Sequence, residues 1–120
     1  MATATPFDRY VDAWNAGDLD RWLEVHDRAV EYVSLAGPEP RVYRGHVGLR
    51  DIWAESRGNW LRFAFAIVAD EGELVHATFS GIEHVGATEL GGALWFRVQT
   101  RGGRIVALWS ALDPELLRAG

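Results

Sequence analysis

His76 and Arg97 are the two side chains of the C-terminal half whose types and spacing could carry acid–base chemistry. An imidazole titrates near neutral pH, which suits a general acid or base. Arg97 lies opposite His76 if two-residue turns join the strands, and its guanidinium group could orient a carboxylate or an enolate oxygen. We therefore predict both as catalytic residues. The alternatives are a core histidine satisfied by a neighbouring hydroxyl group, and an arginine at the pocket rim paired with an acid such as Glu73.

Aromatic and hydroxyl side chains could line a pocket for a small hydrophobic molecule with a ring. Flat indole and phenyl groups suit the apolar walls of such a pocket, and tyrosine hydroxyl groups could face a carbonyl oxygen. The same spacings also build plain core, and a tyrosine can cap a buried backbone group, so only two or three of these residues need touch a ligand. The predicted pocket residues are Trp14, Tyr32, Tyr43, Trp53, Phe63, Phe65, Thr78, Trp95 and Ser110.

The composition disfavours several classes of function. The chain has no Cys, which excludes disulfides, thiolate metal sites and Cys nucleophiles. Its formal net charge of -5 disfavours a nucleic-acid partner. It lacks a phosphate-cradling glycine loop, a dinucleotide fingerprint and a His-x-Glu-x-x-His cluster, so we expect no metal and no cofactor. No apolar run approaches the roughly 20 residues of a membrane span and no signal-peptide pattern opens the chain, so we expect no membrane partner and a cytoplasmic location.

Helical patterns fill the first half of the chain. Thr5 as a cap, Pro6 at the first helical position and an acid in the first turn predict a helix start, and Gly17 is suited to end that helix. A second apolar stripe ends at His26, which we interpret as structural because a cation suits a helix C-terminus. Gly45 stands where a short strand must turn into a third helix. We expect helices at 6–16, 19–26, 45–57 and 115–118, and strands at 29–35 and 41–44.

Four strands with period-two patterning follow, separated by three glycine-containing turns. We expect them at 60–70, 73–85, 88–101 and 104–112, within one domain, 1–120. Two-residue loops place the predicted pocket residues of these strands on one face together with His76 and Arg97. Any bulge would swap the faces beyond it.

The opposite face of this sheet is almost wholly apolar, and helices can cover only one face of a two-layer domain. We predict that the mixed face lines the pocket and that the apolar face, with Phe79, Phe96 and Trp109, forms a homodimer interface. The reverse assignment of the two faces stays open.

Three features together resemble the nuclear transport factor 2-like superfamily, and within it the SnoaL-like and ketosteroid-isomerase-like proteins. They are the run 14–20 (WNAGDLD), the run 43–50 (YRGHVGLR) and the terminal antiparallel sheet. The resemblance covers nearly the whole chain. It implies an α+β fold in which a cone-shaped, curved antiparallel sheet wraps N-terminal helices around a central pocket.

The same resemblance implies isomerases, cyclases, dehydratases, hydrolases or plain binding modules. The isomerases carry an aspartate base after a Val-Glu pair, but Tyr32 follows Val30 and Glu31 here. Many relatives carry an acid where this chain has Ser110. These two differences disfavour proton abstraction by a pocket carboxylate. With His76 as the acid or base, we predict a cofactor-independent enzyme, an isomerase, cyclase, dehydratase or hydrolase, acting on a hydrophobic cyclic or polyketide-like substrate. The alternative is a non-catalytic ligand-binding or dimerisation module.

Overall fold

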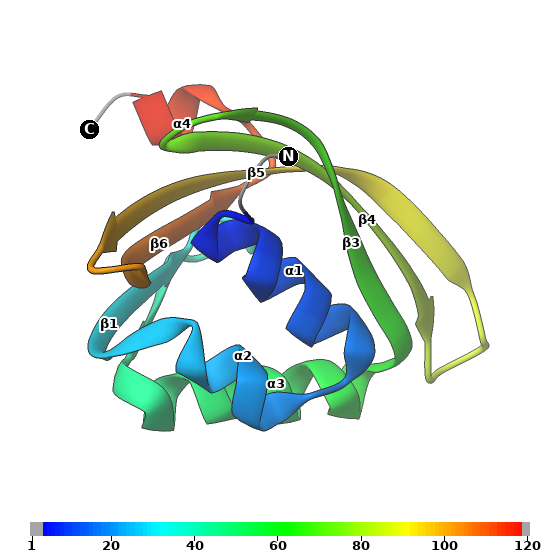
Figure 1. Ribbon diagram of the computed structural model, residues 1–120. Helices are drawn as coiled ribbons and strands as arrows, with labels where there is room; N and C mark the ends of the chain where they lie inside the picture. Colours follow the sequence, from blue (N-terminus) through cyan, green and yellow to red (C-terminus); the bar gives the residue numbers. More distant parts are fainter. Residues whose placement is uncertain (1–3, 119–120) are drawn as a thin grey trace.

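A curved sheet of six strands wraps around helix α1, and helices α2 and α3 lie across the side that the sheet leaves open (Figure 1). This computed structural model describes residues 4–118 and confirms the predicted α+β cone. The elements are α1 (Pro6–Ala16), α2 (Leu19–Glu24), β1 (His26–Ser34), β2 (Arg41–Arg44), α3 (Gly45–Asn59), β3 (Trp60–Glu71), β4 (Leu74–Glu83), β5 (Glu89–Arg101), β6 (Arg104–Ala111) and α4 (Glu115–Arg118).

The strands follow the spatial order β2-β1-β6-β5-β4-β3. All neighbours are antiparallel except β1 and β6, which are parallel and so bring the first and last strands of the chain together. Ser34 pairs there with Ser110. The sheet therefore places residues from both ends of the sequence at its centre.

Local sequence signals set the helix boundaries. The Thr5 side chain accepts a hydrogen bond from the Asp8 backbone N–H, and the Asp8 carboxylate accepts one from the Thr5 backbone N–H. Gly17 ends α1 in a left-handed conformation with φ 69°. These predicted caps are confirmed. One boundary is wrong: α2 stops at Glu24, and His26 opens β1 instead of ending the helix.

The predicted strand register is wrong at all three hairpins, and at two of them the error moves residues between the two faces. Between β4 and β5, Thr78 pairs with Ala93 rather than with Trp95, an even shift that leaves the faces unchanged. Phe65 pairs with Phe79 rather than with Thr78, because Glu71 pairs with Leu74 at the turn and the register shifts between 67 and 69. Ser110 pairs with Phe96 rather than with Trp95, because the register shifts again between 99 and 100. Each odd shift turns the following side chains to the opposite face.

The inner face of the sheet, toward α1, is therefore the apolar one. Phe96 is fully buried there and Phe79 packs against the same core, so the predicted dimer interface through Phe79 and Phe96 is wrong. Phe7 of α1 lies 4.8 Å from Phe96 between ring centroids, and Trp14 lies 5.5 Å from Phe65. The helices cover this face because burying its aromatic side chains away from water stabilises the fold.

The outer face of the sheet keeps the polar residues that were expected to line the pocket. His76 pairs with Trp95, Thr78 lies two residues further along β4, and Arg97 pairs with Trp109. These side chains point away from α1. Within residues 4–118, none of the helices combines the length and the apolar character that crossing a membrane would require.

Gly45 makes the turn from β2 into α3, as predicted. Its φ is +66°, and a Cβ atom there would lie 3.2 Å from the Arg28 carbonyl oxygen. We predict that Gly45→Ala lowers the free energy of unfolding by about 1–2 kcal/mol, because the left-handed backbone strains any residue with a Cβ. Urea unfolding at an unchanged m value measures this loss.

Gly58 provides the matched control within the same helix. It has no positive φ, and a Cβ there would meet no atom within 4 Å. Gly58→Ala should leave stability unchanged or raise it by about 0.5 kcal/mol. Equal losses in both variants would contradict the architectural role of Gly45.

Candidate functional site

Five side chains with polar atoms meet inside the cone, and we call them the interior cluster. Tyr10 comes from α1, Trp22 from α2, His26 and Tyr32 from β1, and Ser110 from β6. Each is at most 8% exposed. Elements from both ends of the chain thus place hydroxyl and ring nitrogen atoms in an otherwise aromatic interior.

His26 presents a free acceptor atom to this interior. Its Nδ1 lies 2.7 Å from the Trp22 carbonyl oxygen. A carbonyl oxygen only accepts, so Nδ1 carries the proton and Nε2 is left with a lone pair. Nε2 is buried and has no hydrogen-bond partner.

Burial also keeps the His26 ring neutral. It lowers the pKa of His26 from 6.5 to about 4; the hydrogen bond to Trp22 opposes this shift and the nearby His46 adds to it. Near neutral pH the side chain is therefore an uncharged imidazole with one unused acceptor.

Trp22 presents the complementary donor. Its Nε1–H is buried without a partner, and its ring packs against His26 at 5.1 Å between centroids. Leaving a buried donor unpaired costs about 1–3 kcal/mol, so a pair of such atoms in one place calls for an explanation. Chemically, the two add one unused donor and one unused acceptor to a packed, largely apolar interior.

Tyrosine hydroxyl groups complete the cluster. The Tyr32 hydroxyl donates to Ser110 Oγ at 3.2 Å. Burial raises the pKa of Tyr10 well above its usual value, the neighbouring Tyr32 raises it further, and the Trp22 indole N–H beside the hydroxyl group opposes the shift. Burial likewise raises the pKa of Tyr32, against the opposing effect of Ser110. Both phenols thus stay protonated and can act as hydrogen-bond donors.

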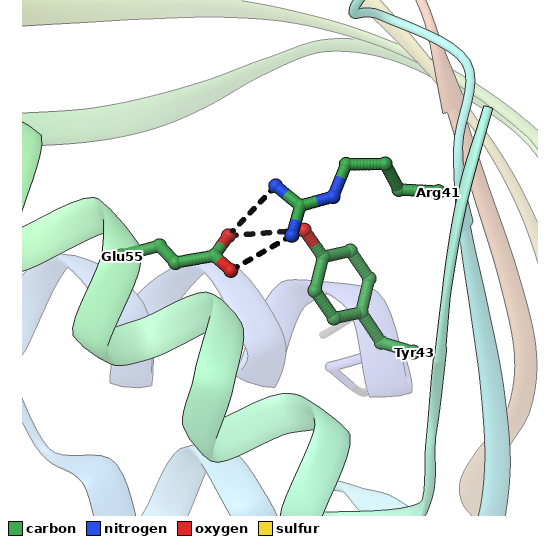
Figure 2. A network of polar contacts seen from close by, with 3 residues as sticks. All are labelled: Arg41, Tyr43 and Glu55. Carbon is green, nitrogen blue, oxygen red and sulfur yellow. Dashed lines mark hydrogen bonds and ion pairs between the residues drawn. The ribbon is translucent and has the colours of Figure 1, made fainter. Parts of the chain in front are cut away.

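A second polar group, the rim network, joins β2 to α3 (Figure 2). Arg41 donates to both Glu55 carboxylate oxygens, at 3.2 and 3.0 Å, and the Tyr43 hydroxyl donates to Glu55 Oε2 at 3.0 Å. Burial, followed by the hydrogen bond to Glu55, raises the pKa of Tyr43 to about 12. The Tyr43 ring meets Tyr32 edge-on at 6.1 Å, so the rim network borders the interior cluster.

The structure brings most predicted pocket residues to the interior. Tyr32 and Ser110 are in contact, and Tyr43 lies beside them. The aromatic residues Trp14, Trp53, Phe63 and Phe65 belong to the core or pack against it.

The predicted catalytic pair lies elsewhere, on the outer face with Thr78 and Trp95. His76 stacks on Trp95 at 4.1 Å, and Arg97 forms an ion pair with Glu73 at 3.8 Å. The expectation that His76 faces Arg97 on an interior pocket wall is wrong. His76 pairs with Trp95 instead, and the register shifts in the two other hairpins turn His76 and Arg97 away from Phe65 and Ser110. A catalytic role for His76 and Arg97 stays a prediction.

Sequence reasoning missed Tyr10 and Glu55, considered Trp22 only as an apolar pocket wall, and interpreted His26 as a helix-end residue. Tyr10 and Trp22 lie in helical apolar stripes that also predict ordinary core, and Glu55 meets β2 only through the tertiary fold. A His at an apolar position was the one available signal. Among residues 4–118, no three His, Asp or Glu side chains gather as a possible metal site.

The cone of six strands around α1 is the fold of nuclear transport factor 2-like proteins, which include the SnoaL-like and ketosteroid-isomerase-like proteins. The family model for the SnoaL-like domain matches residues 7–108, and the chain belongs to this family. A search of curated protein sequences finds no match.

Solved structures share this fold at low sequence identity. TerC, co-crystallised with polyporic acid, has a TM-score of 0.78 at 15% identity, over 95% of this chain and 93% of that one. A ketosteroid-isomerase-like protein from Catenulispora acidiphila, in complex with trimethylamine, has a TM-score of 0.77 at 16% identity, over 91% and 85%. A protein from Jannaschia that is described as a SnoaL-like polyketide cyclase has a TM-score of 0.73 at 15% identity, over 95% of this chain and 87% of that one. At such identities the likeness shows the fold alone.

Protonation of His26 should destabilise the fold as pH falls. The unfolded chain takes up this proton below pH 6.5, whereas the folded chain resists until about pH 4. The contribution of neutral His26 to the free energy of unfolding is therefore complete above pH 6.5. It is lost progressively as the pH falls toward 4, by roughly 3 kcal/mol in total. Urea unfolding between pH 7 and 5 should show a decline in wild type that His26→Asn largely lacks.

His84 supplies the control for this measurement because it is an exposed histidine. His84→Gln should keep the wild-type pH dependence, and direct NMR titration of the imidazole signals should give the lowest midpoint for His26. A wild-type profile that is unchanged in His26→Asn would refute the assignment.

Proposed function

We propose that this protein is a cofactor-independent acid–base enzyme that acts on a hydrophobic cyclic or polyketide-like molecule held inside the cone. The reaction belongs to the class of isomerisation, cyclisation, dehydration or water addition. The carrying observation is the pair of unpartnered atoms, Trp22 Nε1 and His26 Nε2, beside protonated tyrosines in an aromatic interior. Donors and an acceptor that are held ready in a dry site act strongly on developing charge.

The protonation states suggest the roles. Tyr10 donates a hydrogen bond to a carbonyl oxygen as it gains charge, and Tyr32 does the same once its hydroxyl group turns from Ser110 to the substrate. Each such donor contributes about 10²- to 10³-fold in rate in comparable enzymes. His26 accepts a proton or orients a hydroxyl group through Nε2. The aromatic rings hold the apolar body of the substrate.

The low pKa of His26 restricts the substrate further. A group with a pKa of about 4 is unprotonated near neutral pH, but it is a weak base. It can remove only a comparatively acidic proton, such as one on carbon between two carbonyl groups. Polyketide-like molecules carry such carbons, which favours this substrate class over a simple ketone.

Relatives support the proposal in general terms. TerC was crystallised with polyporic acid, and chains from Jannaschia and Silicibacter with this fold are described as polyketide cyclases. These likenesses concern the fold. The residues of this chain itself carry the chemical argument.

A non-catalytic binding module is the second candidate, and one observation favours it. Among residues 4–118, no Asp or Glu side chain is buried, so the interior holds no carboxylate base. Glu55 belongs to the rim and is 41% exposed. Such a pocket can bind a carbonyl compound without turning it over.

Hydrogen–deuterium exchange separates the two candidates. Cyclic 1,3-diketones and aryl ketones incubated with the protein in D2O should exchange their α-hydrogens faster than in buffer, as followed by NMR. Tyr32→Phe should slow this exchange about 10²-fold, and His26→Asn by about 10²- to 10⁴-fold. Binding without any exchange across the panel would support the binding module.

His76→Ala tests the other location for the chemistry. Loss of exchange in this variant, with Tyr32→Phe fully active, would place the reaction on the outer face and refute the interior assignment. Circular dichroism and thermal unfolding establish that each variant remains folded. Mass spectrometry of molecules that copurify with the protein would identify members to add to the panel.

We place the predicted homodimer on the outer face of the sheet. Trp95 and Trp109 lie there half-buried, and Leu112 and Leu116, which follow β6, are 56% and 55% exposed. A stable interface buries about 800 Å² of each partner, and an exposed apolar surface favours association.

Light scattering should give a dimer mass for wild type and a monomer mass for Trp109→Glu. The control is Val47 of α3, which is 75% exposed and lies away from this face; the Val47→Glu variant should remain dimeric.

A further inference from the structure

A small cavity, which we call the corner pocket, lies where α1 ends, α3 ends and β3 begins. Its volume is about 220 Å³. Pockets for drug-sized ligands measure about 300–1,000 Å³, so this one suits a smaller molecule. Its lining residues are Trp14, Asn15, Ala16, Gly17, Ser56, Arg57, Trp60, Leu61, Arg62 and Phe63.

Arg57 brings a half-buried positive charge to the corner pocket. Its guanidinium carbon lies 3.8 Å from the Trp53 ring centroid and 4.9 Å from that of Trp14. Burial lowers the pKa of Arg57, because water is partly removed from the charged group. Contact with two indole rings restricts the movement of the guanidinium group, which favours binding of a partner by its N–H groups.

The ion pairs of the molecule leave Arg57 out. Carboxylates within residues 4–118 pair with Arg21, Arg41, Arg44, Arg97 and Arg118, and none pairs with Arg57. The corner pocket also contains Arg62, and no acidic residue is among its ten lining residues. The local charge is therefore positive in a chain whose formal net charge is -5.

The walls of the corner pocket are aromatic and firmly held. Trp14 Nε1 donates to the Phe63 carbonyl oxygen at 2.9 Å, which fixes that indole. The Asn15 amide group donates to and accepts from the Phe65 backbone, at 2.8 and 2.9 Å. Asn15 is thus engaged, and the two guanidinium groups and the Ser56 hydroxyl group are left to bind a ligand.

We propose that the corner pocket binds a single-ring aromatic carboxylate. Arg57 and Arg62 hold the carboxylate group, with geometry suited to paired N–H donors, and the rings of Trp14, Trp60 and Phe63 contact the aromatic ring. The size of the cavity limits the ligand to one ring. This site uses charged residues outside the interior cluster, so it stands independently of the proposed function.

Benzoate and its uncharged counterpart benzamide test this proposal by NMR titration. Benzoate should shift the indole signals of Trp14 and Trp60 and bind at least about tenfold more tightly than benzamide, since charge-assisted hydrogen bonds are the stronger ones. Added salt should weaken benzoate binding and leave benzamide binding unchanged. No saturable benzoate binding, equal binding of the two probes, or shifts confined to Tyr32 and Ser110 would overturn the proposal.

Variants locate the charge that matters. Arg57→Gln should weaken benzoate binding by about tenfold or more, while Arg50→Gln, at an exposed position of the same helix, should leave it unchanged. Unchanged affinity in a folded Arg57→Gln protein would overturn the proposal. Because Arg57 packs on the core, its loss could unfold the chain. The exposed Arg62 then decides: Arg62→Gln should weaken binding several-fold, and an unaltered affinity would overturn the assignment equally.

Discussion

The packing of α1 on the inner face of the sheet is the constraint on which the rest of this structure depends. Phe7, Tyr10 and Trp14 lie along one stripe of the helix and meet Phe65 and Phe96 across the cone. Burying an aromatic ring removes about 150–250 Å² from water, which at about 25 cal/mol per Å² gives roughly 4–6 kcal/mol for each ring as an upper estimate. An unpaired buried donor or acceptor costs about 1–3 kcal/mol. The aromatic contacts therefore outweigh the cost of the unpartnered Trp22 and His26 atoms.

This excess of stability lets the interior hold polar atoms without charges. His26 stays neutral because burial disfavours its protonated form, and Tyr10 and Tyr32 stay protonated for the corresponding reason. The charged partners are displaced outward: Glu55 is held at the rim by Arg41. Low polarity and fixed hydrogen-bond groups strengthen each other, because an interaction in a dry interior is screened less than in water.

The sequence was sufficient to predict those features of the structure that neighbouring residues determine. Thr5 and Gly17 bound α1, and Gly45 starts α3, because caps and left-handed turns depend on local backbone geometry. The strands were found at nearly their observed positions for the same reason. The family resemblance supplied the cone, which local patterns alone do not determine.

The faces of the sheet could not be predicted, because a one-residue irregularity reverses every side chain beyond it. The shifts near Ile67 and Gln99 leave no mark in the period-two pattern, yet they moved Phe65 and Ser110 to the inside and separated them from His76. The same limit applies to the site. Tyr32 and Ser110 were correctly grouped because both were compared with carboxylate positions of relatives, whereas Glu55 meets Tyr43 only after α3 folds back on β2.

The replacement of carboxylates by hydroxyl groups gives this interior its particular chemistry. Where the resembling isomerases carry an aspartate, this chain has Tyr32, which donates to Ser110. A buried carboxylate would need a charged partner or would be neutralised by a raised pKa, and both outcomes are costly inside an aromatic cone. Phenol and imidazole groups avoid that cost, but they remove protons less readily. The fold thus holds a set of hydrogen-bond donors in place of a strong internal base, and under the proposed function such a set suits a substrate that is already easy to deprotonate.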